Sequence, residues 1–178
     1  QYAAKHDVLI VNAAGNDGNN IDVVKTYPND SKDLLTEVSD NVLTIGAMSA
    51  NYNENLPASF SNYGKINVDI FAPGVKIYST TPENEYKHFS GTSMAAPSTA
   101  GVAALIRSYY PKLSASQVKH IIMNSGTKID LKVAKPGSAS RENPKGDLVS
   151  FADLSVSGRV VNAYNALKMA ERIVKRKK

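Results

Sequence analysis

Two short apolar runs predict strands in the N-terminal part of the chain. Residues 8–14 (VLIVNAA) and 42–48 (VLTIGAM) are rich in apolar and β-branched side chains and show no alternation of polar and apolar positions. Such runs are typical of strands that are buried on both faces of a parallel sheet. Two more short strands are predicted at residues 68–74 (VDIFAPG) and 76–81 (KIYSTT), with a Pro-Gly turn between them.

A long helix is predicted from Ser93. Between residues 93 and 108, small or apolar side chains occur on every side of a helical wheel, which predicts a helix that is buried all round. Gly101 would let this helix pack closely against a neighbour, and Pro97 falls in its expected first turn, where a missing N–H is tolerated. We expect the helix to begin at Ser93 and to reach at least Ile106.

In the C-terminal part of the chain, the sequence predicts two more helices that are separated by a polar segment. Ser114 and Gln117 have the spacing of a capping box, and an apolar stripe follows at Val118, Ile121 and Ile122. Residues 131–157 are rich in Lys, Gly, Pro and Ser and are interpreted as a loop excursion. A last helix is expected from about residue 161 into a basic end at residues 165–178. These elements predict one α/β unit with a parallel sheet.

Composition narrows the possible classes of function. The chain has 178 residues, of which 42% are hydrophobic, enough for one domain with a sizeable core. It contains no cysteine, which excludes a disulfide framework, a zinc-thiolate site and a cysteine nucleophile. No apolar run approaches the ~18 to 20 residues of a membrane span, so we expect none.

The net charge of +5 is concentrated at the C-terminal end. Residues 165–178 contain six basic residues and one acidic residue, so the rest of the chain is neutral by count. Basic residues in a last turn complement the negative end of the helix dipole, and blocks of like charge are usually solvated tails. We therefore expect no nucleic-acid partner; the alternative is a polybasic contact with an anionic partner.

Ser93 has two interpretations at the start of the long helix, in the stretch SGTSMAAPSTAG. As a structural residue it, or Thr92, would cap the helix. As a nucleophile it would use the same position, because the unpaired N–H groups at a helix N-terminus stabilise negative charge on a tetrahedral intermediate. The nucleophile elbow of α/β-hydrolases, G-x-S-x-G, is disfavoured because Ala95 stands in the place of its second glycine.

Four segments resemble the subtilisin-like serine proteases and follow that family's chain order. They are VLIVNAAGND, ASFSNYGKINVDIFAPG, SGTSMAAPSTAGVAALI and GRVVNAYNAL, of which the third is similar to the family's nucleophile segment. The resemblance covers nearly the whole chain apart from residues 131–154. It implies a doubly wound, mainly parallel sheet flanked by helices, and it makes residues 1–178 the C-terminal part of a single peptidase catalytic domain.

The resemblance also implies roles for individual residues. Ser93 would be the nucleophile that forms an acyl-enzyme, and the Asn16 side chain and the Ser93 backbone N–H would donate hydrogen bonds to the oxyanion. On residue types alone, Asn16 in GNDG would be a turn residue. Asp17 would lie at the rim of the pocket for the substrate residue before the scissile bond, where it would favour basic residues weakly. One wall of that pocket would be formed by Ala13, Ala14 and Gly15.

The chain departs from the family pattern in the catalytic base. The family's triad runs in the order aspartate, histidine, serine, with both partners far upstream of the oxyanion asparagine, yet only fifteen residues precede Asn16. Ser98 and Thr99 stand where the family usually has His-Val, a change that should affect packing more than chemistry. No triad motif surrounds the other candidate residues: His6, Asp7, His88 and His120.

We therefore expect the C-terminal half of a serine endopeptidase that acts on polypeptides and is inactive without the upstream half carrying the base and the acid. The alternative is a non-catalytic, protease-like binding or structural module in which Ser93 is only a cap. The family inference for location is secretion or the cell envelope. We also expect Asn16 and Ser93 to lie close together at the carboxyl ends of the parallel strands.

No cofactor is expected to be required. The family often carries structural calcium, and the loop around residues 27–33 offers oxygen ligands at Asn29, Asp30 and Asp33 that could hold a cation weakly. A cluster of this kind is more often simply a polar loop.

Overall fold

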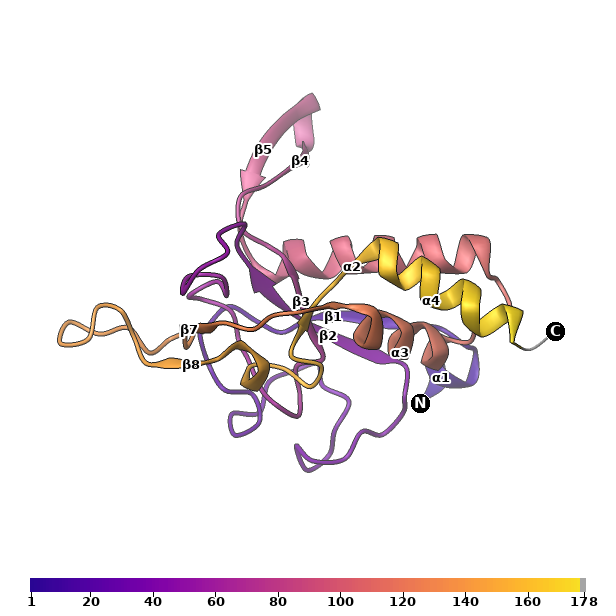
Figure 1. Ribbon diagram of the computed structural model, residues 1–178, viewed down its shortest axis with the longest axis horizontal. Helices are drawn as coiled ribbons and strands as arrows, with labels where there is room; N and C mark the ends of the chain where they lie inside the picture. The colour runs from indigo at the N-terminus through magenta and orange to yellow at the C-terminus, as the bar shows by residue number, and fades with distance from the viewer. Residues whose placement is uncertain (177–178) are drawn as a thin grey trace.

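The computed structural model describes residues 1–176 and has a mainly parallel sheet at its centre (Figure 1). In the described part of the chain, the strand order is β1-β2-β3-β9-β6. Neighbouring strands are parallel from β1 to β9, whereas β6 is antiparallel to β9. The strands are β1 (Ile10–Ala13), β2 (Val42–Met48), β3 (Ile70–Pro73), β9 (Arg159–Val160) and β6 (Thr127–Lys128).

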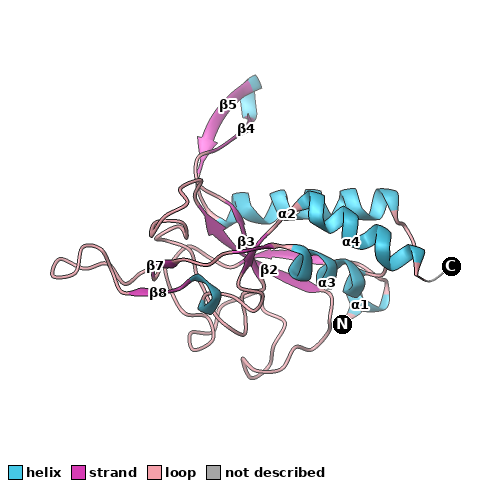
Figure 2. Ribbon diagram, viewed as in Figure 1, coloured by secondary structure: helices cyan, strands magenta, loops and turns pink. Residues whose placement is uncertain are grey.

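Three long helices flank this sheet (Figure 2). They are α2 (Thr92–Tyr109), α3 (Ala115–Ser125) and α4 (Ala163–Lys175), and a short α1 (Tyr2–Lys5) precedes β1. α2 lies against β1, β2 and β3, and the three helices share one apolar core with the sheet. The opposite face of the sheet packs into a second core that contains Phe71 and Phe151, with ring centroids 5.3 Å apart. The α/β fold is thus the one that the sequence predicts.

The first two predicted strands differ in burial. In β2 the side chains of Leu43, Ile45 and Ala47 are fully buried, as expected. The same expectation is wrong for residues 8–14, where Val8 is 48% exposed and Ile10 is 42% exposed. In the described residues β1 pairs only with β2, so its side chains lack neighbours on the far side.

The prediction that the long helix is buried all round is also wrong. One face of α2 is buried against the sheet, but Pro97, Gly101 and Leu105 on the other face are exposed. Apart from its chain neighbours and the backbone of its own helix, no described atom lies within 4 Å of a Cβ built on Gly101, so the expected close packing at that residue is absent there. Because α2 begins at Thr92, Pro97 lies in the second turn rather than the first.

The cap of α3 matches the prediction. The Ser114 hydroxyl accepts from the Gln117 N–H at 3.2 Å, and the Gln117 side chain accepts from the Ser114 N–H at 3.0 Å. The stripe of Val118, Ile121 and Ile122 is buried. α4 starts at the Asn162 cap and runs into the basic end, of which residues 177 and 178 lie outside the described part.

Two hairpins extend from the body of the molecule (Figure 1). β4 (Ile77–Thr81) and β5 (Glu85–Phe89) are joined through a 3-10 turn (Pro82–Asn84), so the predicted strand at residues 76–81 does not enter the main sheet. Residues 131–157, interpreted as a loop, contain a second hairpin of β7 (Lys132–Ala134) and β8 (Leu148–Ser150), followed by a 3-10 turn (Phe151–Asp153). Val133 and Phe151 anchor this segment in the second core, a role that its polar composition conceals.

A buried lysine joins α3 to the sheet. The Lys119 side chain is 1% exposed, and its Nζ lies 2.8 Å from both carboxylate oxygens of Glu37. It also lies 3.7 Å from carboxylate oxygens of Asp40 and Asp69. Burial raises the pKa of Asp69 to about 6. Burial on its own would lower the pKa of Lys119, but Asp69, Glu37 and Asp40 raise it above its usual value.

Replacing Lys119 by Met would leave the Asp69 carboxylate buried without its cation. We expect the free energy of unfolding at pH 7 to fall by about 3 to 5 kcal/mol. The loss should be smaller at pH 5. The pKa of Asp69 is higher in the folded than in the unfolded state, so below that pKa the folded protein holds the proton and no longer needs a partner charge.

Urea unfolding of the intact protein at the two pH values measures this difference. Lys175→Met is the matched control, because Lys175 pairs with Glu171 on an exposed helix face and its loss should change stability little. Equal losses for Lys119→Met at pH 5 and pH 7 would contradict the assigned role of Asp69.

Candidate active site

The loop after β1 turns sharply at Gly15. This residue has a φ of 102°, and a Cβ built on it would stand 2.4 Å from the Asn62 Nδ2 atom, so the turn requires glycine. The Gly15 N–H donates to the Thr92 hydroxyl at 3.1 Å. The turn therefore carries Asn16, three residues beyond the end of β1, to the start of α2.

The Asn16 side chain is fixed by Thr92. Its Oδ1 atom accepts from the Thr92 N–H and from the Thr92 hydroxyl, both at 2.9 Å. The amide nitrogen of Asn16 remains available as a donor. Asn16 Nδ2 and the backbone nitrogen of Ser93 each lie 3.6 Å from the point where a Cβ on Gly91 would stand. Two potential N–H donors thus flank one space in front of Gly91.

Ser93 is the second residue of α2, and it is exposed. The helix begins one residue before the expected start and continues to Tyr109, which confirms its expected minimum length. In the first turn the Ser93 N–H has no intrahelical acceptor, and it lies at the positive end of the helix dipole. The Gly91 N–H donates to the Gly74 carbonyl at 2.7 Å, which ties the start of α2 to the carboxyl end of β3.

The geometry at this helix start bears on the capping interpretation of Ser93. The N-cap of α2 is Gly91, which has no side chain to cap the helix, and the Thr92 N–H donates to Asn16 Oδ1 instead. The Thr92 hydroxyl is engaged with Gly15 and Asn16. The structure therefore brings Asn16 and Ser93 together at the carboxyl ends of β1 and β3, with the Ser93 side chain directed to the surface.

Asn62 holds the turn in place, although no pattern in the sequence singles it out. It is fully buried, its Nδ2 donates to the Ala14 carbonyl at 2.9 Å, and its Oδ1 accepts from the N–H groups of Asp17 (3.1 Å) and Asn19 (2.9 Å). Its own N–H donates to the Gly15 carbonyl at 2.9 Å. Four hydrogen bonds from one residue therefore fix the backbone on both sides of Asn16.

The remaining residues of the predicted pocket lie along the same turn. Ala13 ends β1 and is half-buried. The Ala14 side chain packs into the second core, so only the backbone of Ala14 faces the surface. Gly15 is half-buried, and Asp17 is exposed. These positions are compatible with a small-residue wall and an acidic rim.

The other candidate triad residues are engaged elsewhere. Asp7 pairs with Arg107 and accepts from the Ala115 N–H at 2.6 Å, and this backbone hydrogen bond is the main reason that its pKa is lowered. His120 contacts Asp40 on the outer face of α3, with 2.9 Å between Nε2 and Oδ2. His6 ends α1, and the exposed His88 on β5 lies 3.0 Å from the Lys76 carbonyl.

The loop around residues 27–33, which offers oxygen ligands, folds as a hydrogen-bonded turn. The Asp33 carboxylate accepts from the N–H groups of Thr36 (2.8 Å) and Leu35 (3.0 Å), which lower its pKa to about 2. Asn29 Oδ1 accepts from the Ser31 N–H. Within residues 1–176, no three His, Cys, Asp or Glu side chains are grouped to hold a metal ion. The calcium interpretation of this loop stays a prediction.

Comparison with known proteins assigns the chain to a family. A model of the subtilase family, peptidase family S8, matches residues 1–148, and the chain belongs to this family. Subtilisin DY of Bacillus licheniformis is 41% identical over 127 residues, which cover 68% of this chain and 40% of that protein. Subtilisin Savinase of Lederbergia lenta is 37% identical over 128 residues, covering 71% and 42%. The chain thus spans well under half the length of these relatives.

Solved structures agree on the fold. The prenylagaramide maturation protease PagA superimposes with a TM-score of 0.64 at 26% identity, over 93% of this chain and 52% of that one. The subtilase cytotoxin SubAB gives a TM-score of 0.67 at 24% identity, over 96% of this chain and 52% of that one, a likeness of fold. None of the described helices has the length and apolar character to cross a membrane.

Replacing Asn62 by Ala would leave the Ala14 carbonyl and the N–H groups of Asp17 and Asn19 without their side-chain partner. We expect the amides of Asp17 and Asn19 to exchange with solvent at least about ten times faster in the intact protein, since a lost hydrogen bond to a buried group costs about 1 to 3 kcal/mol. Hydrogen exchange measured by NMR tests this. Asn41→Ala is the control, because Asn41 is also buried but donates to the Val8 carbonyl at the other end of β1. Equal effects of both variants on Asp17 and Asn19 would contradict a local role.

Proposed function

We propose that this chain is the C-terminal part of the catalytic domain of a serine endopeptidase, in which Ser93 is the nucleophile and Asn16 completes the oxyanion hole. The observation that carries the proposal is the pair of donors at Gly91. The Asn16 amide and the Ser93 N–H flank one space at a helix N-terminus. Two N–H donors close to one point could stabilise a carbonyl oxygen that becomes negative, which supports the proposal.

The proposed reaction is acyl transfer through Ser93. The Ser93 hydroxyl attacks the scissile carbonyl carbon, and its proton passes to a histidine base. The carbonyl oxygen becomes an oxyanion that accepts from Asn16 Nδ2 and the Ser93 N–H. The base returns the proton to the leaving amine, and water then hydrolyses the acyl-enzyme.

The base and its orienting aspartate are proposed to come from a polypeptide segment upstream of residues 1–178. Two surfaces of the chain support such a partner. The edge strand β1 exposes Ile10, and the outer face of α2 exposes small or apolar residues at Pro97, Gly101, Ala104 and Leu105. An upstream half that packs on these surfaces would complete the sheet and cover the helix. Family membership also leads us to propose export from the cell.

A fluorophosphonate probe tests the proposed nucleophile, because it reports a serine activated by a base. In the intact protein we expect labelling at Ser93, and residues 1–178 alone should remain unlabelled. Loss of the base costs on the order of 10⁶ in kcat, a magnitude measured in a member of this family. Ser93→Ala should abolish labelling, whereas Ser98→Ala, on the same helix and exposed, should retain it.

Two results would overturn this account. Labelling of residues 1–178 on their own, with mass spectrometry showing no second chain, would mean that a base lies within them. Absence of labelling in the intact, folded protein would favour a non-catalytic module.

Gly91→Ala tests the oxyanion space directly. The backbone of Gly91 is extended, and the nearest atoms to an added methyl group are 3.6 Å away, so the protein should fold normally. The methyl group would occupy the space between the two donors. We expect kcat for peptide hydrolysis to fall by about 10² or more, by analogy with donor removal in a member of this family. An unchanged kcat in a folded variant would show that the substrate oxygen lies elsewhere.

A further inference from the structure

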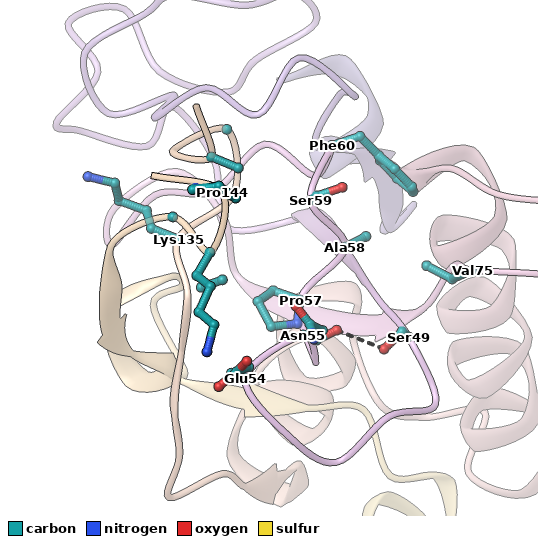
Figure 3. Close-up of a pocket in the computed structure, with 15 residues that line it drawn as sticks. Ser49, Glu54, Asn55, Pro57, Ala58, Ser59, Phe60, Val75, Lys135 and Pro144 are labelled. Carbon is teal, nitrogen blue, oxygen red and sulfur yellow. Dashed lines mark hydrogen bonds between the residues drawn. The ribbon is translucent and has the colours of Figure 1, made fainter. Parts of the chain in front are cut away.

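Two cavities of the described structure differ in the charges that line them. The first, of about 420 Å³, lies between the segment that carries the β7–β8 hairpin and the body of the protein (Figure 3). Glu54 lines it together with Lys135 and Lys145, and the Lys135 Nζ atom also lies 3.0 Å from Asp147 Oδ2. Because the two signs of charge occur together there, this first cavity gives no reason to expect an ionic ligand.

The second cavity, of about 480 Å³, is lined by basic side chains only. It lies where the end of α3, the strands β6 and β9 and one face of α4 meet. No carboxylate lines it, and its four basic residues are Lys128, Arg159, Lys168 and Arg172. Among the residues that the structure describes, no carboxylate oxygen lies within 4.0 Å of these four side chains. The positive charge of this cavity is therefore unbalanced.

Hydrogen bonds hold the walls of the second cavity in place. The Arg159 Nη1 atom donates to the Gly126 carbonyl at 2.9 Å, which positions the guanidinium beside the end of α3. The Asn162 Nδ2 atom donates to the Thr127 hydroxyl at 3.0 Å, and its Oδ1 atom accepts from the Asn165 N–H at 3.0 Å. Asn162 thus caps α4 and fixes the start of this helix on β6, so the basic residues of both elements keep their relative places.

The arrangement on α4 gathers positive charge on one face of the helix. Lys168 and Arg172 are four residues apart, a spacing at which like charges repel. The Lys168 Nζ atom lies 5.1 Å from the centre of the Tyr164 ring, and Tyr164 also lines the cavity. The first turn of α4 adds the positive end of the helix dipole. An anion in the cavity would reduce this repulsion.

A buried hydroxyl group lies at the same cavity. Ser125 lines the cavity and is only 6% exposed, and its hydroxyl has no hydrogen-bond partner among the described residues. Buried hydroxyl groups normally have a partner. A ligand oxygen would provide one here.

We propose that the second cavity binds a phosphate monoester, with the phosphate group held by Lys128, Lys168 and Arg172. Four positive charges favour a ligand with more than one negative charge, and a phosphate monoester carries about −1.5 to −2 at pH 7. Ammonium and guanidinium groups form strong, charge-assisted hydrogen bonds to phosphate oxygens. The cavity is many times larger than a water molecule, so it has room for the organic part of the ester beside Tyr164.

The position of the cavity in the sheet leaves it open in the intact protein. β6 lies at the opposite edge of the main sheet from β1. The upstream half that we propose would pack on β1 and on the outer face of α2, away from this edge. The basic C-terminal end of the chain thus contributes to a cavity and is more than a solvated tail. This inference does not depend on Ser93 being a nucleophile.

Calorimetric titration of the intact protein with glucose 6-phosphate tests the proposal. We expect binding with a Kd of about 1 mM or lower at low salt. Glucose, which lacks the anionic group, should not bind. Inorganic phosphate distinguishes two sources of the anionic group: weaker binding than that of the ester would identify the ester as the ligand, and equal binding would identify the free anion.

The variant Lys128→Gln/Lys168→Gln removes two of the four charges. Both side chains are exposed, so the protein should fold normally, which an unchanged urea midpoint would show. We expect the affinity for glucose 6-phosphate to fall at least about 10-fold, because two charge-assisted hydrogen bonds are lost.

Lys32→Gln/Lys112→Gln is the matched control. It removes two charges from exposed lysines that do not line the cavity, so the affinity should change less than about twofold. Equal weakening in both variants would reduce the effect to net charge and overturn the proposal. Absence of glucose 6-phosphate binding, or full affinity in the Lys128→Gln/Lys168→Gln variant, would also overturn it.

Discussion

The hydrogen bonds of Thr92 are the interaction on which the site depends. Through its N–H and its hydroxyl, this residue binds Asn16 Oδ1, and its hydroxyl also accepts from the Gly15 N–H. These three bonds join a turn after β1 to the first turn of α2, across 76 or 77 positions of sequence. Because a backbone N–H can only donate, the bond to Thr92 also fixes which end of the Asn16 amide faces the helix, and it leaves the donor end free.

The rest of the local structure keeps this junction rigid. Asn62 fixes the turn after β1 with four hydrogen bonds. The Gly74 carbonyl, just after β3, accepts from the Gly91 N–H and fixes the start of α2. A donor pair held in this way needs no rearrangement when negative charge develops, which is why preorganised hydrogen bonds contribute so much to catalysis. The same rigidity reaches residues 135–147 through the contact between Gly18 and Gly137.

Local patterns in the sequence predicted the elements that depend on local physics. β2 is recognisable because the apolar run alone identifies a strand that is buried on both faces. The capping box of α3 is recognisable because both of its residues lie within four positions of the chain. The resemblance in SGTSMAAP and NAAGND identified Ser93 and Asn16, which the structure brings to one helix start. Pro97 is the sixth residue of α2 and would be the fifth in a helix that began at Ser93, so the prediction that it lies in the first turn is wrong for either start.

Features that depend on distant contacts could not be predicted. The exposure of the outer face of α2 and of Ile10 is set by what packs on them, and a helical wheel does not contain that information. Asn62 has no periodic signal, because its partners lie 43 to 48 positions away. Lys119 resembles any polar helix residue until Glu37, Asp40 and Asp69 converge on it from separate segments.

The most direct test of the central claim is the effect of Asn16→Ala on peptide hydrolysis by the intact protein. One of the two proposed donors would be missing, and of the three bonds between the turn and α2 only the one from the Gly15 N–H to the Thr92 hydroxyl would remain. The account predicts that kcat falls by about 10² to 10³, the range known for this donor in a member of the family, with KM changed little. A folded variant whose kcat falls by less than about threefold, or whose loss lies in KM alone, would contradict the assignment of Asn16 to the oxyanion.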